Sequence, residues 1–336
     1  MERKCAIILP YFGKFNNYFP LFLKSCGKNK KFTWIIYTDD KTKFDYPDNV
    51  QVKYMSFYEF QDFVSQKFDF RISLERAYKL CDFRPAYGYI FEDDIKGFEY
   101  WGHCDCDLVF GNLDKLLIPI INEGYDKIFA VGHLTLYKNT KENNLLFKSK
   151  LNGREIYREF MTSSEGCWFD EDWKDENIHA IFLEKSKKVY TKDLSANPYG
   201  DYARFRLRGY DSSERCFKTE SYKESLFIWN NGEIIRYYKK GKSEVNSQEY
   251  LYMHLQRRKM KMIKSDRFGD YFAIIPNKFV PLKSINDIKV EWKKIRKWHI
   301  SMLNQPYDKW SKKIIRLFTR ICNRFTKNSR SMVKEV

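Results

Sequence analysis

The first 70 residues alternate short apolar runs with segments of helical periodicity, and this alternation constrains the fold more than any other feature. The apolar runs cover residues 5–12, 32–38 and 50–57 and predict buried strands. Residues 18–26 and 58–67 carry the periodicity of helices. Strand, helix, strand, strand, helix in this order and at this spacing predicts an α/β domain with a largely parallel sheet.

The rest of the chain is less regular. The further elements that we expect are helices at residues 72–81, 112–122 and 170–185, a strand at 127–136 and a hairpin at 226–238. Ser73 fits the N-cap of the first of these helices. Asn230-Asn231-Gly232 centres the hairpin, because Asn-Gly suits the two left-handed positions of a type I′ turn.

Polar and aromatic residues fall at three predicted strand ends. They are Pro10, Tyr11 and Phe12, then Thr38 and Asp39, and then Asp105 and Asp107. In an open α/β sheet the ligand binds outside the carboxyl ends of the strands. We therefore expect these groups to converge on one crevice, although each could be an ordinary loop start.

Asp105 and Asp107 stand two residues apart between an aromatic run and an apolar run. On an extended backbone, residues i and i+2 point to the same face. Two such carboxylates can hold one Mg²⁺ or Mn²⁺ ion, which shares its ligands with a substrate diphosphate. The alternatives are a pair of solvated turn carboxylates, or a structural zinc site at His103, Cys104 and Cys106. Zinc needs four ligands, and the sequence offers no second cluster.

A second constellation lies just before Pro85. Lys79, Asp82 and Arg84 fall at a predicted helix end. The arginine could pair with a diphosphate and the aspartate could accept from a base N–H. Local salt bridges at a capped helix terminus explain the same residues equally well.

The net charge of +17 is unevenly distributed. Residues 257–336 carry 22 lysines and arginines against six acidic residues, so the rest of the chain is nearly neutral. A basic C-terminal segment on an otherwise nearly neutral chain predicts docking to an acidic surface and argues against nucleic acid as a partner. The eight cysteines show no disulfide spacing, and no run is long enough for a signal peptide or a spanning helix. We therefore expect a reduced, cytoplasmic protein.

An amphipathic helix is predicted at about residues 308–326. Its apolar stripe consists of Trp310, Ile314, Leu317, Phe318, Ile321 and Phe325, and most of its lysines and arginines lie off that stripe. This pattern is typical of a helix lying in a membrane interface, where anionic lipid attracts clustered Lys and Arg. The alternative is a helix that packs on the domain with a solvated basic face.

Four motifs together resemble a known family. They are Leu-Pro-Tyr-Phe-Gly (9–13), Tyr-Thr-Asp-Asp (37–40), Leu-Cys-Asp-Phe-Arg-Pro-Ala-Tyr-Gly (80–88) and Trp-Gly-His-Cys-Asp-Cys-Asp-Leu-Val-Phe-Gly-Asn-Leu (101–113). Across roughly residues 5–260 the chain resembles a bacterial capsular or exopolysaccharide glycosyltransferase family similar to GT-A-type enzymes. The resemblance implies a GT-A-like nucleotide-diphospho-sugar transferase fold, a Rossmann-like mixed sheet flanked by helices. The expected organisation is a catalytic domain at 1–260, with a nucleotide half at about 1–113 and an acceptor half at about 114–260, followed by a basic helical extension at 261–336.

The resemblance also implies roles for single residues. Tyr11 and Asp39 would lie beside the nucleotide base, Arg84 would meet the diphosphate, Asp105 would face ribose and metal, and Asp107 and His254 would complete the metal site. Pro10, Phe12, Thr38, Lys79 and Asp82 join the expected nucleotide-sugar set. Cys106 departs from the residue familiar between the aspartates, and we expect it to point away from the metal.

For the part of the site that would bind the acceptor, the sequence offers only candidate residues. His133 and Thr135 lie in the second half of the segment predicted as a strand at 127–136 and are the expected acceptor contacts. An inverting transferase needs a carboxylate as general base, and Asp170 or Glu171 at a predicted helix start could supply it. Acidic residues are also favoured at any helix N-terminus, which is the alternative explanation.

These observations predict a metal-dependent glycosyltransferase of the hexosyltransferase type. It would use Mn²⁺ or Mg²⁺ and move a sugar from a nucleotide-sugar, with a UDP-sugar favoured, to a growing surface polysaccharide on a lipid carrier. It would act as a peripheral protein at the inner face of the plasma membrane. A non-catalytic glycan-binding or scaffold protein is an alternative, because 28 Phe, 24 Tyr and 8 Trp residues supply stacking surfaces. A metal-dependent phosphotransferase or nuclease is another alternative. The nearly neutral charge of residues 1–256 argues against it, because a polyanionic substrate favours a basic site.

Overall fold

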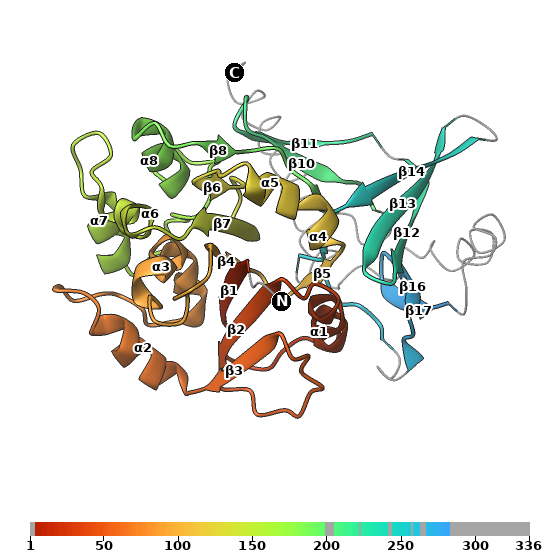
Figure 1. Ribbon diagram of the computed structural model, residues 1–336, viewed down its shortest axis with the longest axis horizontal. Helices are drawn as coiled ribbons and strands as arrows, with labels where there is room; N and C mark the ends of the chain where they lie inside the picture. Colours follow the sequence, from red (N-terminus) through yellow and green to blue (C-terminus); the bar gives the residue numbers. More distant parts are fainter. Residues whose placement is uncertain are drawn as a thin grey trace, which may run out of the picture.

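A seven-stranded mixed sheet forms the centre of the fold (Figure 1). Its strands in spatial order are β3 (Val50–Tyr54), β2 (Phe32–Thr38), β1 (Cys5–Pro10), β4 (Tyr100–Cys104), β7 (Leu134–Lys138), β6 (Lys127–Ile128) and β8 (Val189–Tyr190). The first four run parallel, β7 is antiparallel to both β4 and β6, and β8 is parallel to β6. The computed structural model describes residues 4–198, 205–221, 223–240, 244–256, 258–262 and 267–282.

Helices cover both faces of this sheet (Figure 1). On one face pack α1 (Phe19–Gly27), α4 (Leu113–Leu116) and α5 (Ile118–Asn122); on the other pack α2 (Phe57–Ser65), α3 (Tyr87–Ile90), α7 (Ile156–Thr162) and α8 (Ile178–Glu184). Alternate residues of β1 enter the two cores, Ile7 on the α1 side and Ile8 on the α2 side. A strand that is buried on both faces has a continuous apolar run in its sequence. The predicted α/β class with a mixed sheet flanked by helices is confirmed.

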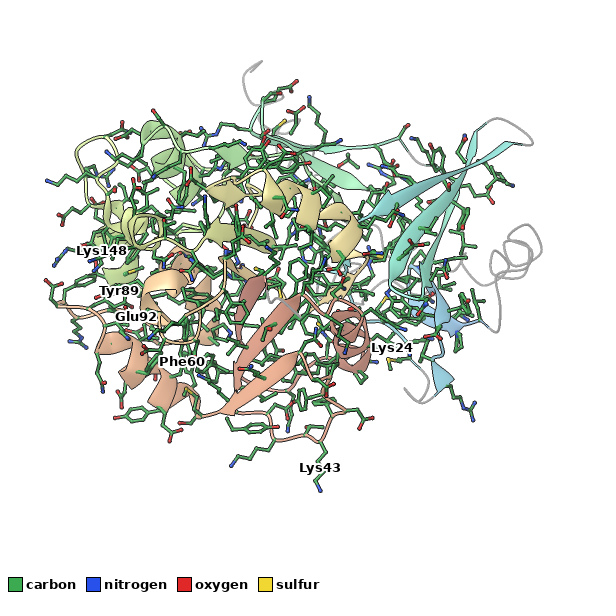
Figure 2. All side chains as sticks on the ribbon, in the orientation of Figure 1. Lys24, Lys43, Phe60, Tyr89, Glu92 and Lys148 are labelled. Atoms are coloured by element: carbon green, nitrogen blue, oxygen red, sulfur yellow. The ribbon has the colours of Figure 1, made fainter. Side chains whose placement is uncertain are left out.

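A second sheet is antiparallel and lies beside α1 (Figure 1). Its order is β14 (Glu244–Tyr250), β13 (Glu233–Lys240), β12 (Ser225–Asn230), β16 (Tyr271–Ile275) and β17 (Lys278–Pro281). Asn231 and Gly232 join β12 to β13 with φ of 45° and 100°, which confirms the predicted hairpin. Lys24 of α1, labelled in Figure 2, places its Nζ 5.9 Å from the centre of the Trp229 ring of β12.

Two smaller sheets complete the described strands. One contains β5 (Leu108–Phe110), β15 (Tyr252–His254) and β9 (Ser195–Ala196), and the other contains β10 (Arg208–Asp211) and β11 (Cys216–Thr219). β15 runs antiparallel to β5 with His254 opposite Leu108. This pairing connects the segment between β14 and β16 of the second sheet to the segment that follows β4.

The first five predicted elements match the structure within a few residues, but several later ones were wrong. Residues 72–81 form no α-helix: the only regular turn is the 3₁₀ segment η1 (Ala77–Asp82), and the Ser73 N–H donates to the Met161 carbonyl instead of starting a helix. Residues 127–136 are two antiparallel strands, because the backbone turns at Phe129 (φ 71°). The helix predicted from residue 170 begins only at Ile178, where the Asn177 side chain accepts the Ala180 N–H.

The helix predicted at residues 112–122 is divided into α4 and α5. Leu117 separates them, and Pro119 stands in the first turn of α5. Proline cannot donate an N–H to the preceding turn, so it ends one helix and suits the start of the next. The remaining short segments are η2 (Arg84–Ala86), α6 (Lys141–Leu145) and η3 (Leu146–Lys148).

The predicted amphipathic helix at about residues 308–326 lies outside the described residues, as does most of the extension at 261–336. Across the described ranges, the structure contains no helix with the length and apolar character needed to cross a membrane.

Candidate functional site

A cavity of about 1070 Å³ opens at the carboxyl ends of β1 and β4. β1 lies between β2 and β4, so the chain connections depart in opposite directions at this point of the sheet. Such a switch point is where ligands bind in open α/β sheets. Pro10, Tyr11 and Phe12 at the end of β1 line the cavity, as do Asp105 and Asp107 after β4.

Asp105, Asp107 and His254 converge in this cavity. The His254 Nε2 lies 3.5 Å from the Asp105 Oδ2 and 3.4 Å from the Asp107 Oδ1. One ligand atom of each residue lies within 4.8 Å of the other two. Within the described part of the chain, this is the only group of three or more His, Cys, Asp or Glu side chains that could hold a metal ion.

Two backbone pairings assemble the cluster. Cys104 pairs with Leu134, so Asp105 lies beside β7 and its N–H donates to the His133 carbonyl at 3.1 Å. The pairing of β5 with β15 brings His254 to Asp107, whose carbonyl accepts the Leu255 N–H at 3.0 Å. The two aspartates lie on a turn between β4 and β5 and not on the extended backbone that we expected. They meet because the chain turns, not because a pleat aligns them.

His133 supports His254 from one side. The two rings lie 4.7 Å apart between centroids, and the Tyr252 hydroxyl lies 2.6 Å from the His133 Nδ1. Burial alone would lower the pKa of His254, but the carboxylates of Asp107 and Asp105 outweigh it and raise that pKa. Burial and the neighbouring His254 lower the pKa of His133. His133 therefore packs against an imidazole that is paired with two carboxylates.

Arg84 bridges the metal cluster to a loop across the cavity. Its guanidinium donates to the Asp105 carboxylate, to the Asp170 Oδ2 at 2.8 Å and to the Gly132 carbonyl at 3.0 Å. The side chain is 20% exposed. Its charge is thus already shared between two carboxylates, one of them in the candidate metal site.

Asp170 and Glu171 lie in a loop and not at a helix start; Asp170 is buried and Glu171 is half-buried. Burial raises the pKa of Glu171, and the adjacent charge of Asp170 raises it further. Gly132 packs against both: a Cβ there would lie 2.3 Å from the Asp170 Oδ2 and 3.0 Å from the Glu171 Oε1. Asp170 is held by Arg84, whereas the buried Glu171 Oε2 has no hydrogen-bond partner among the described residues.

Lys79 and Asp82 do not line the cavity. The Lys79 Nζ donates to the Asp82 carboxylate at 2.7 Å, and both side chains are at most 1% exposed. Asp82 also accepts the N–H groups of Cys167 at 2.9 Å and Phe169 at 3.0 Å. The pair fixes the start of the loop that carries Asp170 and Glu171. Of the predicted acceptor contacts, His133 lines the cavity, but Thr135 is buried and donates to a backbone carbonyl.

Thr38 and Asp39 also lie off the cavity lining. The Asp39 Oδ1 accepts the Gly13 N–H at 2.7 Å, and the Thr38 Oγ1 accepts the Asp40 N–H at 3.1 Å. Asp39 therefore shapes the loop after β1, which presents Tyr11, whereas Thr38 shapes the loop after β2.

Sequence reasoning missed several residues that line the cavity. They are Asn16, Asn17, Tyr78, Trp168, Trp173, Asn197, Arg208, Phe217, Gln256, Arg258 and Lys259. The run of basic residues from 257 to 259 is visible in the sequence, but it indicated only an excess of positive charge and not a place in the cavity. The tryptophans lie on a loop without periodicity, so no pattern marked them.

A family model described as "Family of unknown function (DUF6625)" matches residues 7–283. None of the curated proteins matches the chain. Among solved structures, the chain is similar to mouse xyloside xylosyltransferase 1 in its apo form, with 10% identity and a TM-score of 0.32 over 59% of this chain and 88% of that one. It is also similar to galactosyltransferase LgtC in complex with donor and acceptor sugar analogs, with 9% identity and a TM-score of 0.30 over 57% and 76%.

A third similar structure is the glycosyltransferase GlyE of Streptococcus pneumoniae TIGR4, with 11% identity and a TM-score of 0.31. The match covers 56% of this chain and 45% of that one, so it spans less than half of the GlyE chain. TM-scores near 0.3 carry no argument about function, which has to be inferred from the site itself.

Proposed function

We propose that the chain, which belongs to the family of unknown function DUF6625, is a metal-dependent glycosyltransferase that takes a sugar from a nucleotide-sugar donor. The cluster of Asp105, Asp107 and His254 on a large cavity supports this proposal most directly. Drug-sized ligand pockets measure about 300–1,000 Å³. A cavity of about 1070 Å³ has room for a nucleotide-sugar and for part of an acceptor.

The donor set fits a divalent cation. Two carboxylates and one imidazole within 4.8 Å of one another suit Mn²⁺ better than Mg²⁺, which prefers an all-oxygen shell. Asp105, Asp107 and His254 would hold the ion. When bound, such an ion neutralises the charge that develops on a departing diphosphate.

Other residues of the cavity would bind the rest of the donor. Tyr11, at the end of β1, presents its ring to the nucleotide base. Lys259 is exposed in the cavity lining and close in sequence to His254, where it would contact a phosphate. Arg84 acts by orienting Asp105, because its guanidinium is committed to that carboxylate and to Asp170.

Glu171 is the proposed general base. Burial raises the pKa of Asp170 to about 6 although Arg84 opposes the rise, but the ion pair with Arg84 occupies this carboxylate and leaves it less available to a substrate hydroxyl. The pKa of Glu171 is raised by burial, and a base works best when its pKa lies near the operating pH. Glu171 would accept the proton of the attacking acceptor hydroxyl.

The acceptor that we propose is a hydroxyl of a growing surface polysaccharide, carried on a lipid. The basic excess after residue 257 supports an anionic membrane surface as the place of reaction. In this proposal residues 1–260 carry catalysis, with the nucleotide half at about 1–113 and the acceptor half at about 114–260.

Thermal unfolding with UDP tests the metal site. UDP with Mn²⁺ should stabilise the protein, by about 2.7 kcal/mol at a hundredfold excess over Kd, and UDP with EDTA should not. Asp107→Ala should lose the effect, while Asp62→Ala on the exposed surface of α2 keeps it. Equal stabilisation with and without metal would contradict the proposal. A screen of nucleotide-sugars then separates a transferase, which releases sugar, from a phosphotransferase, which releases phosphate.

A further inference from the structure

Aromatic side chains gather at the mouth of the cavity. Among the described residues, five large apolar or aromatic side chains are exposed, and two of them, Tyr78 (52%) and Trp173 (42%), line this cavity. Trp168 and Phe217 line it as well. Exposed aromatic surface at a cavity is a mark of a binding site, because it costs free energy in water until a ligand covers it.

The backbone at Trp168 is held in an unusual conformation. Its φ of 58° lies in the left-handed region, which bulky residues rarely adopt. The N–H groups on both sides of it, from Cys167 and Phe169, donate to the Asp82 carboxylate, which is completely buried. Such strain persists only where the surroundings impose it, and it is concentrated at functional sites. The Lys79–Asp82 pair therefore fixes the position of Trp168 in the cavity wall.

The two tryptophans form a corner beside the proposed base. Their rings lie 5.7 Å apart between centroids at 55° to each other, and the Lys174 Nζ lies 4.3 Å from the Trp168 ring centre and 5.3 Å from that of Trp173. Asp170 and Glu171 lie between them in the chain and line the same cavity. Two aromatic rings and an ammonium group that contacts both thus lie on the loop that carries the proposed base.

We propose that Trp168 and Trp173 form the acceptor subsite and bind a pyranose ring of a glycan by stacking. One face of a pyranose presents C–H groups, which suit the electron-rich face of an indole ring. The hydroxyl groups at the edge of the same sugar would contact Glu171 and Lys174. This inference rests on the proposed function, because it assigns the acceptor side of the same cavity and places the attacking hydroxyl near Glu171.

Saturation-transfer NMR on the full chain with UDP and Mn²⁺ tests this subsite. The probes are methyl β-D-galactoside, methyl α-D-glucoside, methyl α-D-mannoside, lactose and cellobiose. We expect at least one probe to receive saturation on the protons of one ring face. Trp168→Ala and Trp173→Ala should lose at least four-fifths of that signal, and Trp168→Phe should retain most of it. Tyr58→Ala, which removes a 69% exposed ring on α2 outside the cavity, should change nothing.

The affinity for UDP with Mn²⁺ separates the two proposals. In the tryptophan variants it should stay within twofold of the wild type. The subsite is overturned if no probe binds, if Trp173→Ala binds probes like the wild type, or if either alanine variant weakens UDP binding tenfold, which would make the rings a nucleotide site. If UDP never binds but sugar binding depends on the tryptophans, the subsite stands and the transferase proposal fails.

Discussion

At the scale of a single residue, Arg84 contributes to the candidate site although its guanidinium is not free to bind a ligand. The sequence predicted a diphosphate contact, and the structure commits the guanidinium to Asp105, Asp170 and the Gly132 carbonyl. A charged hydrogen bond to a carboxylate is stronger than a neutral one, and the guanidinium fork gives one N–H donor to each of two carboxylates. Arg84 therefore links the orientation of a metal ligand to the loop that carries the proposed base.

Replacing Arg84 by alanine should weaken nucleotide binding through Asp105. In the presence of Mn²⁺ we expect the affinity for UDP to fall at least tenfold, because two carboxylates lose their shared partner. Arg84→Lys should recover only part of the loss, since an ammonium cannot reproduce the fork. Isothermal titration calorimetry measures these affinities. Lys43→Ala is the control, because Lys43 projects away from the molecule in Figure 2. Equal affinities for the two alanine variants would remove Arg84 from the site.

Asp82 should matter for stability. Asp82→Ala leaves the buried Lys79 charge uncompensated, and breaking a buried pair in this way costs about 3–5 kcal/mol. The double variant Lys79→Met/Asp82→Leu should lose less, because it buries no lone charge. Urea unfolding gives the free energies, with Asp62→Ala as a surface control. A loss below about 1 kcal/mol in Asp82→Ala would show that the pair is not important, since ordinary surface substitutions stay within about 0.5 kcal/mol.

At the scale of elements, the sequence predicts a segment well where the interactions that determine its structure lie within that segment. Residues 5–67 were predicted within a few residues, because apolar periodicity acts within the segment; the Ser56–Glu59 capping box, which the prediction did not use, starts α2 at Phe57 and is equally local. Residues 72–81 and 170–177 were not, because Asp82 and Arg84 hold that region through contacts far apart in the chain. The same holds for the site. The spacing of Asp105 and Asp107 is visible in the sequence, whereas His254 was suggested only by family resemblance and Trp168 by nothing.

The loops after β1 and β2 are joined by Asp40, and this connection should depend on pH. Burial would raise the pKa of Asp40, but hydrogen bonds from Lys14, Thr42 and the Phe15 N–H outweigh it and hold that pKa well below its usual range. A lowered folded-state pKa contributes stability above the unfolded value of about 3.9, and that contribution is lost as the pH falls further.

Asp40→Asn should therefore reduce the free energy of unfolding at pH 7 by about 1–3 kcal/mol, as expected for a buried group that loses charged hydrogen bonds. The difference from the wild type should shrink when both are measured below about pH 3.9. Urea unfolding at pH 7 and pH 3 provides the comparison, with the exposed Asp45→Asn as the control. A difference that is the same at both pH values would assign the effect to packing and not to charge.

At the scale of the whole molecule, most of the basic excess lies in a different part of the chain from the candidate site. The described cavity is built by residues up to 260 and takes only Arg258 and Lys259 from the 22 lysines and arginines of residues 257–336. Clustered basic residues near an anionic bilayer contribute about 1 kcal/mol each, and salt screens this term over about 10 Å at 0.1 M. We expect surface attachment and catalysis to be separable.

Deleting residues 306–336 should release the protein from anionic liposomes and leave hydrolysis of a soluble donor unchanged. The full chain should sediment with phosphatidylglycerol vesicles at low salt and dissociate as the salt concentration rises. Neutral phosphatidylcholine vesicles are the control for non-specific sedimentation. If the truncated chain sediments as well as the full one, the predicted helix is not the anchor.

The pairing of β5 with β15 also determines when the candidate metal site can form during translation. A ribosome adds about 5–20 residues per second, so Asp105 and Asp107 leave the exit tunnel seconds before His254. Every strand from β6 to β14 is made in between. A nascent chain can thus form its central sheet while its third ligand is still unmade. On the proposed function, a nascent chain that lacks His254 would hold no donor and consume no activated sugar, and the enzyme would become competent only once β15 has been made and has paired with β5.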